Sequence, residues 1–435
     1  MSSSPGGGTG SKSAVSDCIL LLFANSVQHW CRHITEDDDA LDKLEQEKFD
    51  VAVVDSDFSK CNYLIPHRLQ IPWIAYDVGI NPNVVRVPWL PSFVPSPFLP
   101  FSDKMAFTER LKNTADLFIM FFVRKRYFPD PPHEILQKFR RYGHFSSLDE
   151  LVSKSVLWFT ITDGIIDYPR PMMPNMVSIA GLTVKRSTGK LSTDIKNFID
   201  GAKKGVILVT FGSIVSTIPR DVVEKFASAF RQLDGYRVIW RLNNIDNVKL
   251  PDNIMIAQWL PQGDILAHPS VKLFVTHCGT NGQYEAVYHG VPMIGFPVFL
   301  DQFYNAKRLV HKGFGLSMNI HDFTAGQLLD NIHKILEDKS YKERVTKASE
   351  IFRSQAQSPI KRATFWIEHV CRFGGDHLRS AGNDLPLYSY LMLDVLAFFI
   401  TAFLFIIYVL YVLIKFVMNM CCERTASKSS PKKNE

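Results

Sequence analysis

The sequence lacks most of the patterns that mark a well-defined functional class. Its seven cysteines form no CxxC pair and show no metal-ligand spacing, so no zinc or other metal site is expected. No G-x-G-x-x-G follows an apolar run, which argues against a dinucleotide-dependent dehydrogenase. Charge of one sign is scarce too: the net charge is +6, and the last 21 residues, with five basic and two acidic side chains, hold half of it. The nearly neutral body argues against nucleic acid as a partner.

The start of the chain has no long apolar run. Residues 1–17 are polar and rich in Ser and Gly, and we interpret them as a low-complexity start. The apolar run Cys18–Ala24 that follows has seven residues, comes directly after Asp17 and has no clean cleavage site. These features are more typical of a packed helix than of a secretory signal peptide.

One long apolar run is present, and it lies near the C-terminus. Val395–Ile414 contains 20 residues without a charge, which is enough to cross a hydrocarbon core of about 30 Å as a helix. Lys415 and the basic tail, residues 415–435, predict a cytosolic tail with the body on the other side of the membrane. The chain ends in Lys432-Lys433-Asn434-Glu435, which resembles a dilysine retrieval signal for the endoplasmic reticulum. We therefore expect a single-pass protein of that membrane, with its body in the lumen.

Short apolar runs alternate with helical patterns from Lys203 onward, and this alternation predicts an α/β fold with a doubly wound parallel sheet and ligands at the carboxyl ends of its strands. The predicted strands are Gly205–Phe211, Arg237–Trp240, Ile254–Gln258, Val271–Thr276 and Val291–Phe296. Upstream we expect a helix over about Ser26–Lys48, a strand over Phe49–Val54, a proline-rich irregular surface over Pro82–Pro100, and core packing for the apolar run Phe118–Val123.

The densest group of chemistry-bearing residues lies between Trp259 and Gln302. The turn after the strand Val271–Thr276 leads into a helix whose first N–H groups and dipole favour an anion such as a diphosphate. Beside this turn, protonated His277 would donate a charge-assisted hydrogen bond to a phosphate, and Glu285 would accept from a pair of ribose hydroxyls. Each residue alone is more often structural, but their joint spacing predicts a site for a nucleoside diphosphate attached to a sugar.

This segment resembles the signature of the membrane-bound UDP-glycosyltransferases, the UDP-glucuronosyltransferase family. Similar segments are GVILVTFGSIVS at 205–216, DQFYNAKRL at 301–309, DHLRSAGNDLPLYSYLMLDV at 376–395 and, upstream, KFDVAVVDSDFSKC at 48–61. The resemblance implies a GT-B fold of two Rossmann-like domains plus one C-terminal transmembrane helix. Because Phe49 arrives early compared with the family pattern, we expect the N-terminal domain to be truncated.

The resemblance also suggests how the chain is divided. After the low-complexity start we expect a truncated acceptor-side domain over residues 18–195 and a UDP-sugar-binding domain over residues 196–365. A helical return segment over 366–390, a transmembrane helix over 391–414 and the basic tail complete the expected organisation.

By resemblance, the donor site is assembled from one domain. Trp259 would stack on uracil, Gln262 would hydrogen-bond its edge, and Glu285 would hold the ribose. The phosphates would be met by Ser213, His277, Gly279, Asn281 and Gly282, and the sugar hydroxyls by Asp301 and Gln302. The UDP-sugar is a co-substrate, and no other cofactor is implied. One departure is Cys278, where the family usually has glycine; a positive φ there would cost about 1 kcal/mol.

The function implied is transfer of a hexose or hexuronic acid from UDP-sugar to a hydroxyl of a small lipophilic acceptor, with inversion. In the family a histidine takes the acceptor's proton and an aspartate orients it. Asp55 matches that aspartate, whereas no histidine matches the family position, and His29 is the nearest stand-in. The alternative is a catalytically impaired, membrane-anchored UDP-sugar-binding partner that forms homo- or hetero-oligomers with full-length relatives.

Overall fold

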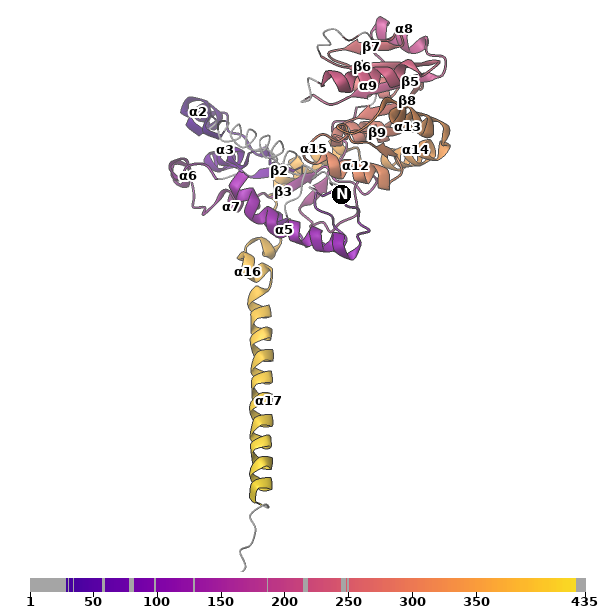
Figure 1. The fold of residues 1–435 in the computed structure, drawn as a ribbon. Coiled ribbons are helices and arrows are strands. Elements are labelled where there is room, and N and C mark those ends of the chain that lie inside the picture. Colours follow the sequence, from indigo (N-terminus) through magenta and orange to yellow (C-terminus); the bar gives the residue numbers. More distant parts are fainter. Residues whose placement is uncertain are drawn as a thin grey trace, which may run out of the picture. The chain divides into compact units, whose positions relative to one another are not determined.

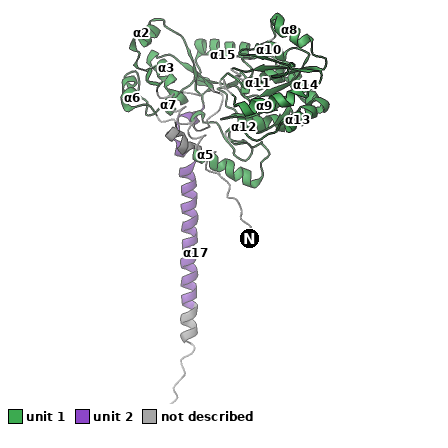
Figure 2. Cartoon of the chain, turned by 45° about the horizontal axis from the view of Figure 1, so that its top comes forward, with its two compact units in different colours: residues 1–379 green, residues 380–435 purple. Residues whose placement is uncertain are grey.

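The structure is a computed structural model. It describes residues 29, 31–33, 35–56, 59–77, 82–97, 99–127, 130–185, 187–213, 218–243, 248 and 250–427. Residues 1–379 and residues 380–435 form two compact units (Figure 2). The apolar run Cys18–Ala24 and the dilysine end lie outside the described residues.

The first half of the larger unit contains a four-stranded parallel sheet in the order β1-β2-β3-β4 (Figure 1). Its strands are β1 (Ala52–Asp55), β2 (Trp73–Asp77), β3 (Leu157–Thr160) and β4 (Met176–Ser178). All four residues of β3 are buried, as expected for a parallel strand with both faces covered. Around the sheet lie η1 (Lys60–Tyr63), α2 (Asp38–Gln46), α3 (Leu64–Leu69), α4 (Pro82–Val85), α5 (Phe107–Tyr127), α6 (His133–Arg140) and α7 (Leu148–Ser153).

The structure departs from two expectations for this half. The helix expected over Ser26–Lys48 is interrupted at Asp37, whose side chain caps α2 by accepting a hydrogen bond from the backbone N–H of Ala40 at 2.9 Å. The run Phe118–Val123 was expected in the core, but Phe118 is 65% exposed and Ile119 55% exposed. The run lies within the continuous helix α5, where successive side chains point to different sides, so a helix that packs on one face leaves some of them outside.

The second half of the larger unit contains a six-stranded parallel sheet in the order β10-β9-β8-β5-β6-β7. Its strands are β5 (Gly205–Thr210), β6 (Tyr236–Arg241), β7 (Ile254–Ala257), β8 (Val271–Thr276), β9 (Met293–Gly295) and β10 (Gly315–Ser317). The chain adds β6 and β7 on one side of β5, then crosses to β8 on the other. The doubly wound sheet predicted from the sequence is confirmed, and its topological switch point lies between β5 and β8.

Helices cover both faces of this sheet. Apolar side chains of α9 (Arg220–Arg231) and α13 (Ala325–Glu337) fill one core with β5 and β6. Those of α8 (Thr193–Asp200), α11 (Thr280–Tyr288) and α14 (Lys339–Arg353) fill the other. The remaining helices, α10 (Gln262–Leu266) and α12 (Gln302–His311), begin near the carboxyl ends of β7 and β9. The residues that the sequence predicts to meet a ligand therefore gather along one edge.

The chain then returns to the first sheet through α15 (Pro359–Phe373). Ala363 and Val370 of this helix pack with Ile74 and Phe159, and Arg362 Nη1 donates a hydrogen bond to the backbone oxygen of Ser178 at 2.8 Å. One Rossmann-like half thus receives a helix from the end of the other.

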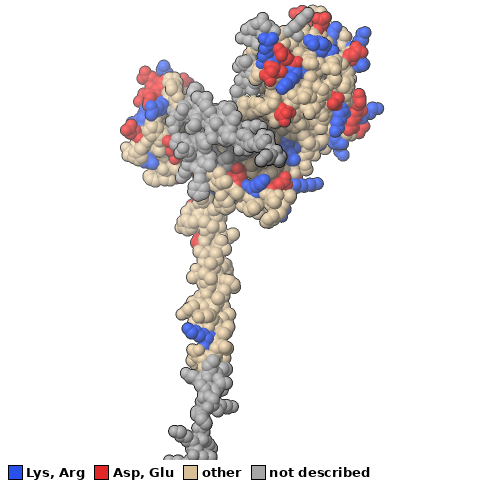
Figure 3. Space-filling model, viewed as in Figure 1, with Lys and Arg blue, Asp and Glu red and all other residues tan. Residues whose placement is uncertain are grey.

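The smaller unit contains α16 (Leu387–Tyr390) and the long helix α17 (Leu393–Ser427) (Figure 1). Within α17, the 28 residues Leu393–Met420 form a stretch that is long and apolar enough to cross a membrane. Most of its surface carries no charged side chain (Figure 3).

Candidate functional site

The centre of the candidate site is His277, at the switch point where β5 and β8 end. Its ring lies between two glycines: a Cβ added to Gly212 would come 2.6 Å from His277 Nε2, and one added to Gly279 would come 2.5 Å from the same atom. Gly212 has a φ of 76°, whereas Gly279 has φ −60° and ψ 140°, a conformation open to any residue. A glycine is therefore needed at 279 because any side chain there would collide with the His277 imidazole, and not because of its backbone conformation.

Burial determines the charge of this imidazole. It lowers the pKa of His277 to about 4, although the nearby carboxylate of Asp301 acts in the opposite direction. Among the described residues, the buried Nδ1 of His277 has no hydrogen-bond partner. In the ligand-free protein the imidazole is therefore neutral near pH 7, because desolvation outweighs the single carboxylate. The expected bond from a protonated ring to a phosphate stays a prediction.

Cys278 adopts a positive φ, the conformation in which a non-glycine residue at this position is strained. Its φ is 67°, its side chain is fully buried, and burial raises the pKa of the thiol, which is therefore neutral. A Cβ added to Gly295 would lie only 2.2 Å from the Cys278 Sγ atom. In the turn between β8 and α11, the thiol thus occupies space that a glycine at 278 would leave open.

This packing predicts a coupled effect on stability. Gly295→Ala should lower the free energy of unfolding by about 1–3 kcal/mol, because the new methyl group meets the Cys278 thiol. In a Cys278→Gly background the same change should cost much less, since the next atom, Leu316 O, is 3.7 Å away. Denaturant unfolding of the four variants measures the coupling, and equal costs in the two backgrounds would contradict it.

The helix after this turn, α11, begins without a side-chain cap. Its N-cap residue is Gly279, so its first N–H groups are not satisfied by a capping side chain. Asn281 is exposed on the first turn, and its Oδ1 accepts a hydrogen bond from Thr183 Oγ1 at 3.3 Å. Gly282 is buried, and a Cβ there would make only an ordinary 3.5 Å contact with Phe274. The absence of a side chain is thus critical at 279 and less so at 282.

The residues assigned to the base and ribose form a hydrogen-bonded chain. Thr210 Oγ1 donates to Gln262 Oε1 at 2.7 Å, and Gln262 Nε2 donates to Glu285 Oε2. Burial raises the pKa of Glu285, and the bond from Gln262 opposes that shift. Trp259 is 75% exposed and so is available for stacking, with the Arg241 guanidinium 5.1 Å from its ring centroid. No sequence motif marked Arg241, which lies at the end of the neighbouring strand β6.

The two residues assigned to the sugar differ in their surroundings. Asp301 Oδ2 accepts hydrogen bonds from Asn305 Nδ2 at 2.6 Å and from Thr280 Oγ1 at 3.2 Å. Gln302 is buried, and its Oε1 accepts from the backbone N–H groups of Val298 and Phe299. Asp301 is therefore better placed to meet a ligand. The expected phosphate ligand Ser213 is exposed and directly follows Gly212 at the end of β5.

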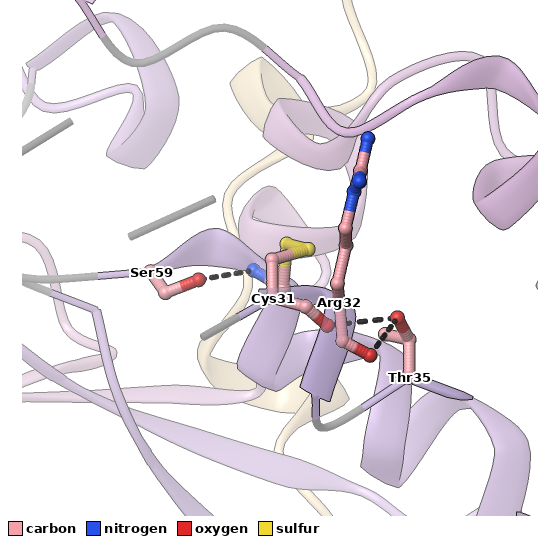
Figure 4. Close-up of a disulfide and its surroundings, with 5 residues drawn as sticks. Cys31, Arg32, Thr35 and Ser59 are labelled. Atoms are coloured by element: carbon pink, nitrogen blue, oxygen red, sulfur yellow. Dashed lines mark hydrogen bonds between the residues drawn. A yellow bond between two sulfur atoms is a disulfide. The ribbon is translucent and has the colours of Figure 1, made fainter. Parts of the chain in front are cut away.

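In the first half of the chain, Asp55 ends β1 and is exposed, and His29 is an exposed helical residue. A disulfide between Cys31 and Cys61, which the cysteine spacing did not reveal, connects the segment carrying His29 to η1 (Figure 4). No local motif marks such a pair, because its members are brought together only by the fold.

Comparison with known proteins gives a consistent result. The profile of the family described as "UDP-glucoronosyl and UDP-glucosyl transferase" matches residues 12–428. A UDP-glucuronosyltransferase of Pleuronectes platessa is 32% identical over 421 residues, covering 92% of this chain and 85% of the relative. A 2-hydroxyacylsphingosine 1-beta-galactosyltransferase of Rattus norvegicus is 34% identical over 396 residues, covering 88% and 72% respectively.

Solved structures show the same architecture. The glycosyltransferase VinC, solved in complex with DTDP, aligns with a TM-score of 0.57 at 15% identity, covering 83% of this chain and 81% of VinC. The glycotransferase of kitacinnamycin aligns with a TM-score of 0.58 at 18% identity, covering 81% and 83%. With its two parallel sheets and the return of α15, the fold is GT-B, as the sequence predicted.

Proposed function

Because this chain belongs to the UDP-glucoronosyl and UDP-glucosyl transferase family, we propose that it transfers a hexose or hexuronic acid from a UDP-sugar to a hydroxyl of a small lipophilic acceptor, with inversion. The observation that carries the proposal is the placement of His277 between Gly212 and Gly279 at the switch point of the second sheet. This arrangement directs an imidazole and the uncapped start of α11 to one edge, where a diphosphate would be held.

The contacts of the site suggest a role for each group. Trp259 stacks on the uracil and Gln262 binds its edge, while Glu285 accepts hydrogen bonds from the ribose hydroxyls. Asp301 reads the hydroxyls of the transferred sugar. As the bond to the sugar breaks, negative charge grows on the β-phosphate, and the α11 N–H groups with the His277 ring stabilise it. The acceptor oxygen attacks from the face opposite UDP, which inverts the anomeric carbon.

The test of this function is direct. Full-length protein in detergent is incubated with radiolabelled UDP-glucuronate or UDP-glucose and a phenolic acceptor, and UDP binding is measured in parallel by calorimetry. Transfer with either donor supports the enzyme. UDP binding without transfer supports the alternative of a catalytically impaired, membrane-anchored partner of relatives. Failure to bind UDP contradicts both.

Substitution of Asp55 distinguishes the active transferase from the catalytically impaired partner. If no histidine is oriented by its carboxylate, Asp55→Asn should change the residual transfer rate by less than about threefold. A general base that depends on this carboxylate would instead lose much of a roughly 10²–10⁴-fold contribution. A large loss of transfer in Asp55→Asn would show that a base is present, and His29→Ala would then test the nearest stand-in.

We also propose that the body lies in the lumen of the endoplasmic reticulum and the tail in the cytosol. Lys415 directly follows the uncharged run Val395–Ile414 of α17. The Cys31–Cys61 disulfide also supports this topology, because disulfides persist in oxidising compartments. In sealed microsomes, added protease should remove only residues beyond the membrane helix. Digestion of the body without detergent would contradict this topology.

A further inference from the structure

A group of buried polar residues connects the two halves of the larger unit. The connection between β3 and β4, residues 161–175, carries Asp167, which is only 3% exposed. Tyr304 Oη on α12 donates to Asp167 Oδ1 at 2.5 Å, and Arg170 Nη2 donates to the same oxygen at 2.8 Å. Arg308 Nη1, one turn further along α12, lies 3.5 Å from Asp167 Oδ2. A carboxylate of the first half is thus enclosed by a helix of the second.

The charges of this network are deeply buried. Burial alone would raise the pKa of Asp167, but Arg170 and Arg308, with the hydrogen bond from Tyr304, hold it below its usual value, so the carboxylate is ionised. Such a buried ionic group gives little net stability compared with apolar side chains of similar volume. What it provides is a fixed geometry, because each charge requires its partner in one place.

From Asp167 a continuous chain of contacts leads to the candidate sugar-binding carboxylate. Arg308 Nε donates to Gln283 Oε1 at 3.1 Å, and Gln283 Nε2 donates to the backbone oxygen of Asn305 at 3.0 Å. Asn305 Nδ2 then donates to Asp301 Oδ2 at 2.6 Å. Arg308, Gln283 and Asn305 are all buried, so water competes little for these bonds.

Other contacts of the same connection anchor it without reaching Asp301. Tyr284 Oη donates to the backbone oxygen of Ile161 at 2.9 Å, and Lys312 Nζ donates to that of Gly164 at 2.9 Å. These bonds can be compared with those of Asp167, because they join the same two parts of the chain but end on neutral backbone carbonyl groups.

We propose that Asp167 is a positioning residue for the donor sugar: through Tyr304, Arg308 and the contacts that follow, it sets the orientation of Asp301 relative to the acceptor-side domain. This inference rests on the proposed function. UDP itself is held by residues of α10 and α11 and by Trp259. Disturbing the network should therefore affect the sugar and its transfer while leaving the nucleotide in place.

Tyr304→Phe tests the proposal in the full-length protein. It keeps the ring but removes the hydroxyl, which donates to Asp167 Oδ1 and accepts from Arg170 Nη2 at 2.9 Å. We expect the transfer rate with a phenolic acceptor to fall about 10- to 100-fold, the size typical of a misplaced reacting group. The affinity for UDP, measured by calorimetry, should stay within about threefold, and the preference for UDP-sugar over UDP should shrink.

Tyr284→Phe is the matched control, because it makes the same change at a buried tyrosine that bonds the same connection. It should leave the preference for UDP-sugar unchanged. In an Asp301→Asn background, Tyr304→Phe should cause little further loss, since both act through one carboxylate. If Tyr304→Phe does not fold, Arg170→Lys, which retains the charge but alters the contact with Tyr304, takes its place.

A fall in UDP affinity equal to the fall in transfer, or full additivity with Asp301→Asn, would overturn the positioning role. Wild-type protein that neither binds UDP-sugar nor transfers the sugar would instead refute the proposed function. The two failures are thus distinguishable.

Discussion

Gly279→Ala is expected to weaken UDP-sugar binding by about 100-fold or more, or nearly 3 kcal/mol. The backbone at Gly279 accepts alanine without strain, with φ −60° and ψ 140°. The new Cβ, however, would lie 2.5 Å from His277 Nε2, so the ring must leave its place or the start of α11 must move. Either movement disrupts the edge that would hold the diphosphate. Calorimetry with UDP-glucose or UDP-glucuronate measures the loss.

The matched control is Gly263→Ala, at the start of α10 and next to Gln262. A Cβ there meets no atom within 4 Å, so binding should not change. A further comparison places Gly279→Ala in a His277→Ala background, where the methyl group has no ring to displace and should add less than about threefold. An equal loss with and without the ring would show that Gly279 acts on the ligand directly.

His277→Ala should weaken binding of the same UDP-sugar by about 10- to 150-fold, corresponding to about 1.5–3 kcal/mol for a hydrogen bond to a charged group. The stabilising form is the protonated ring. In the free protein burial holds the pKa of His277 at about 4, and a bound diphosphate raises it by supplying negative charge. Binding therefore takes up a proton at any pH between the free and bound pKa values.

The sign of the pH dependence follows. Since the bound complex holds more protons than the free protein, affinity is greatest at low pH and falls as pH rises through the bound-state pKa of His277. UDP-glucose suits the measurement because its diphosphate does not titrate near neutral pH. Calorimetry in two buffers of different ionisation enthalpy should detect proton uptake in the wild type and none in His277→Ala. If the wild type takes up no proton, the ring binds as a neutral donor.

The sequence by itself determined the second Rossmann-like domain and the long apolar helix α17. Both are encoded by local patterns: β-branched apolar runs alternating with helical periods, and an uncharged run long enough to cross a bilayer. The candidate donor-site residues could be proposed from the sequence for a similar reason, because most of them lie close together between Trp259 and Gln302. The switch point follows from the order in which those strands are laid down.

Most of the first sheet could not be predicted from the sequence. β2, β3 and β4 are short, and a 79-residue stretch between the end of β2 and the start of β3 contains no further strand among its described residues. The partners of such strands are set by contacts far along the chain, so local periodicity predicted only β1. The exposed face of α5 was missed because an apolar run does not reveal which of its residues find a core.

Only the tertiary structure decided what surrounds each functional group. The buried His277 ring lies against Gly212, which is more than sixty residues upstream and comes close because β5 and β8 pair. The Cys31–Cys61 disulfide and the link from Asp167 to Tyr304 likewise join segments distant in sequence. The spacing of residues along one strand or helix can be predicted from the sequence. Desolvation and long-range pairing arise only when segments distant in sequence pack together and exclude water.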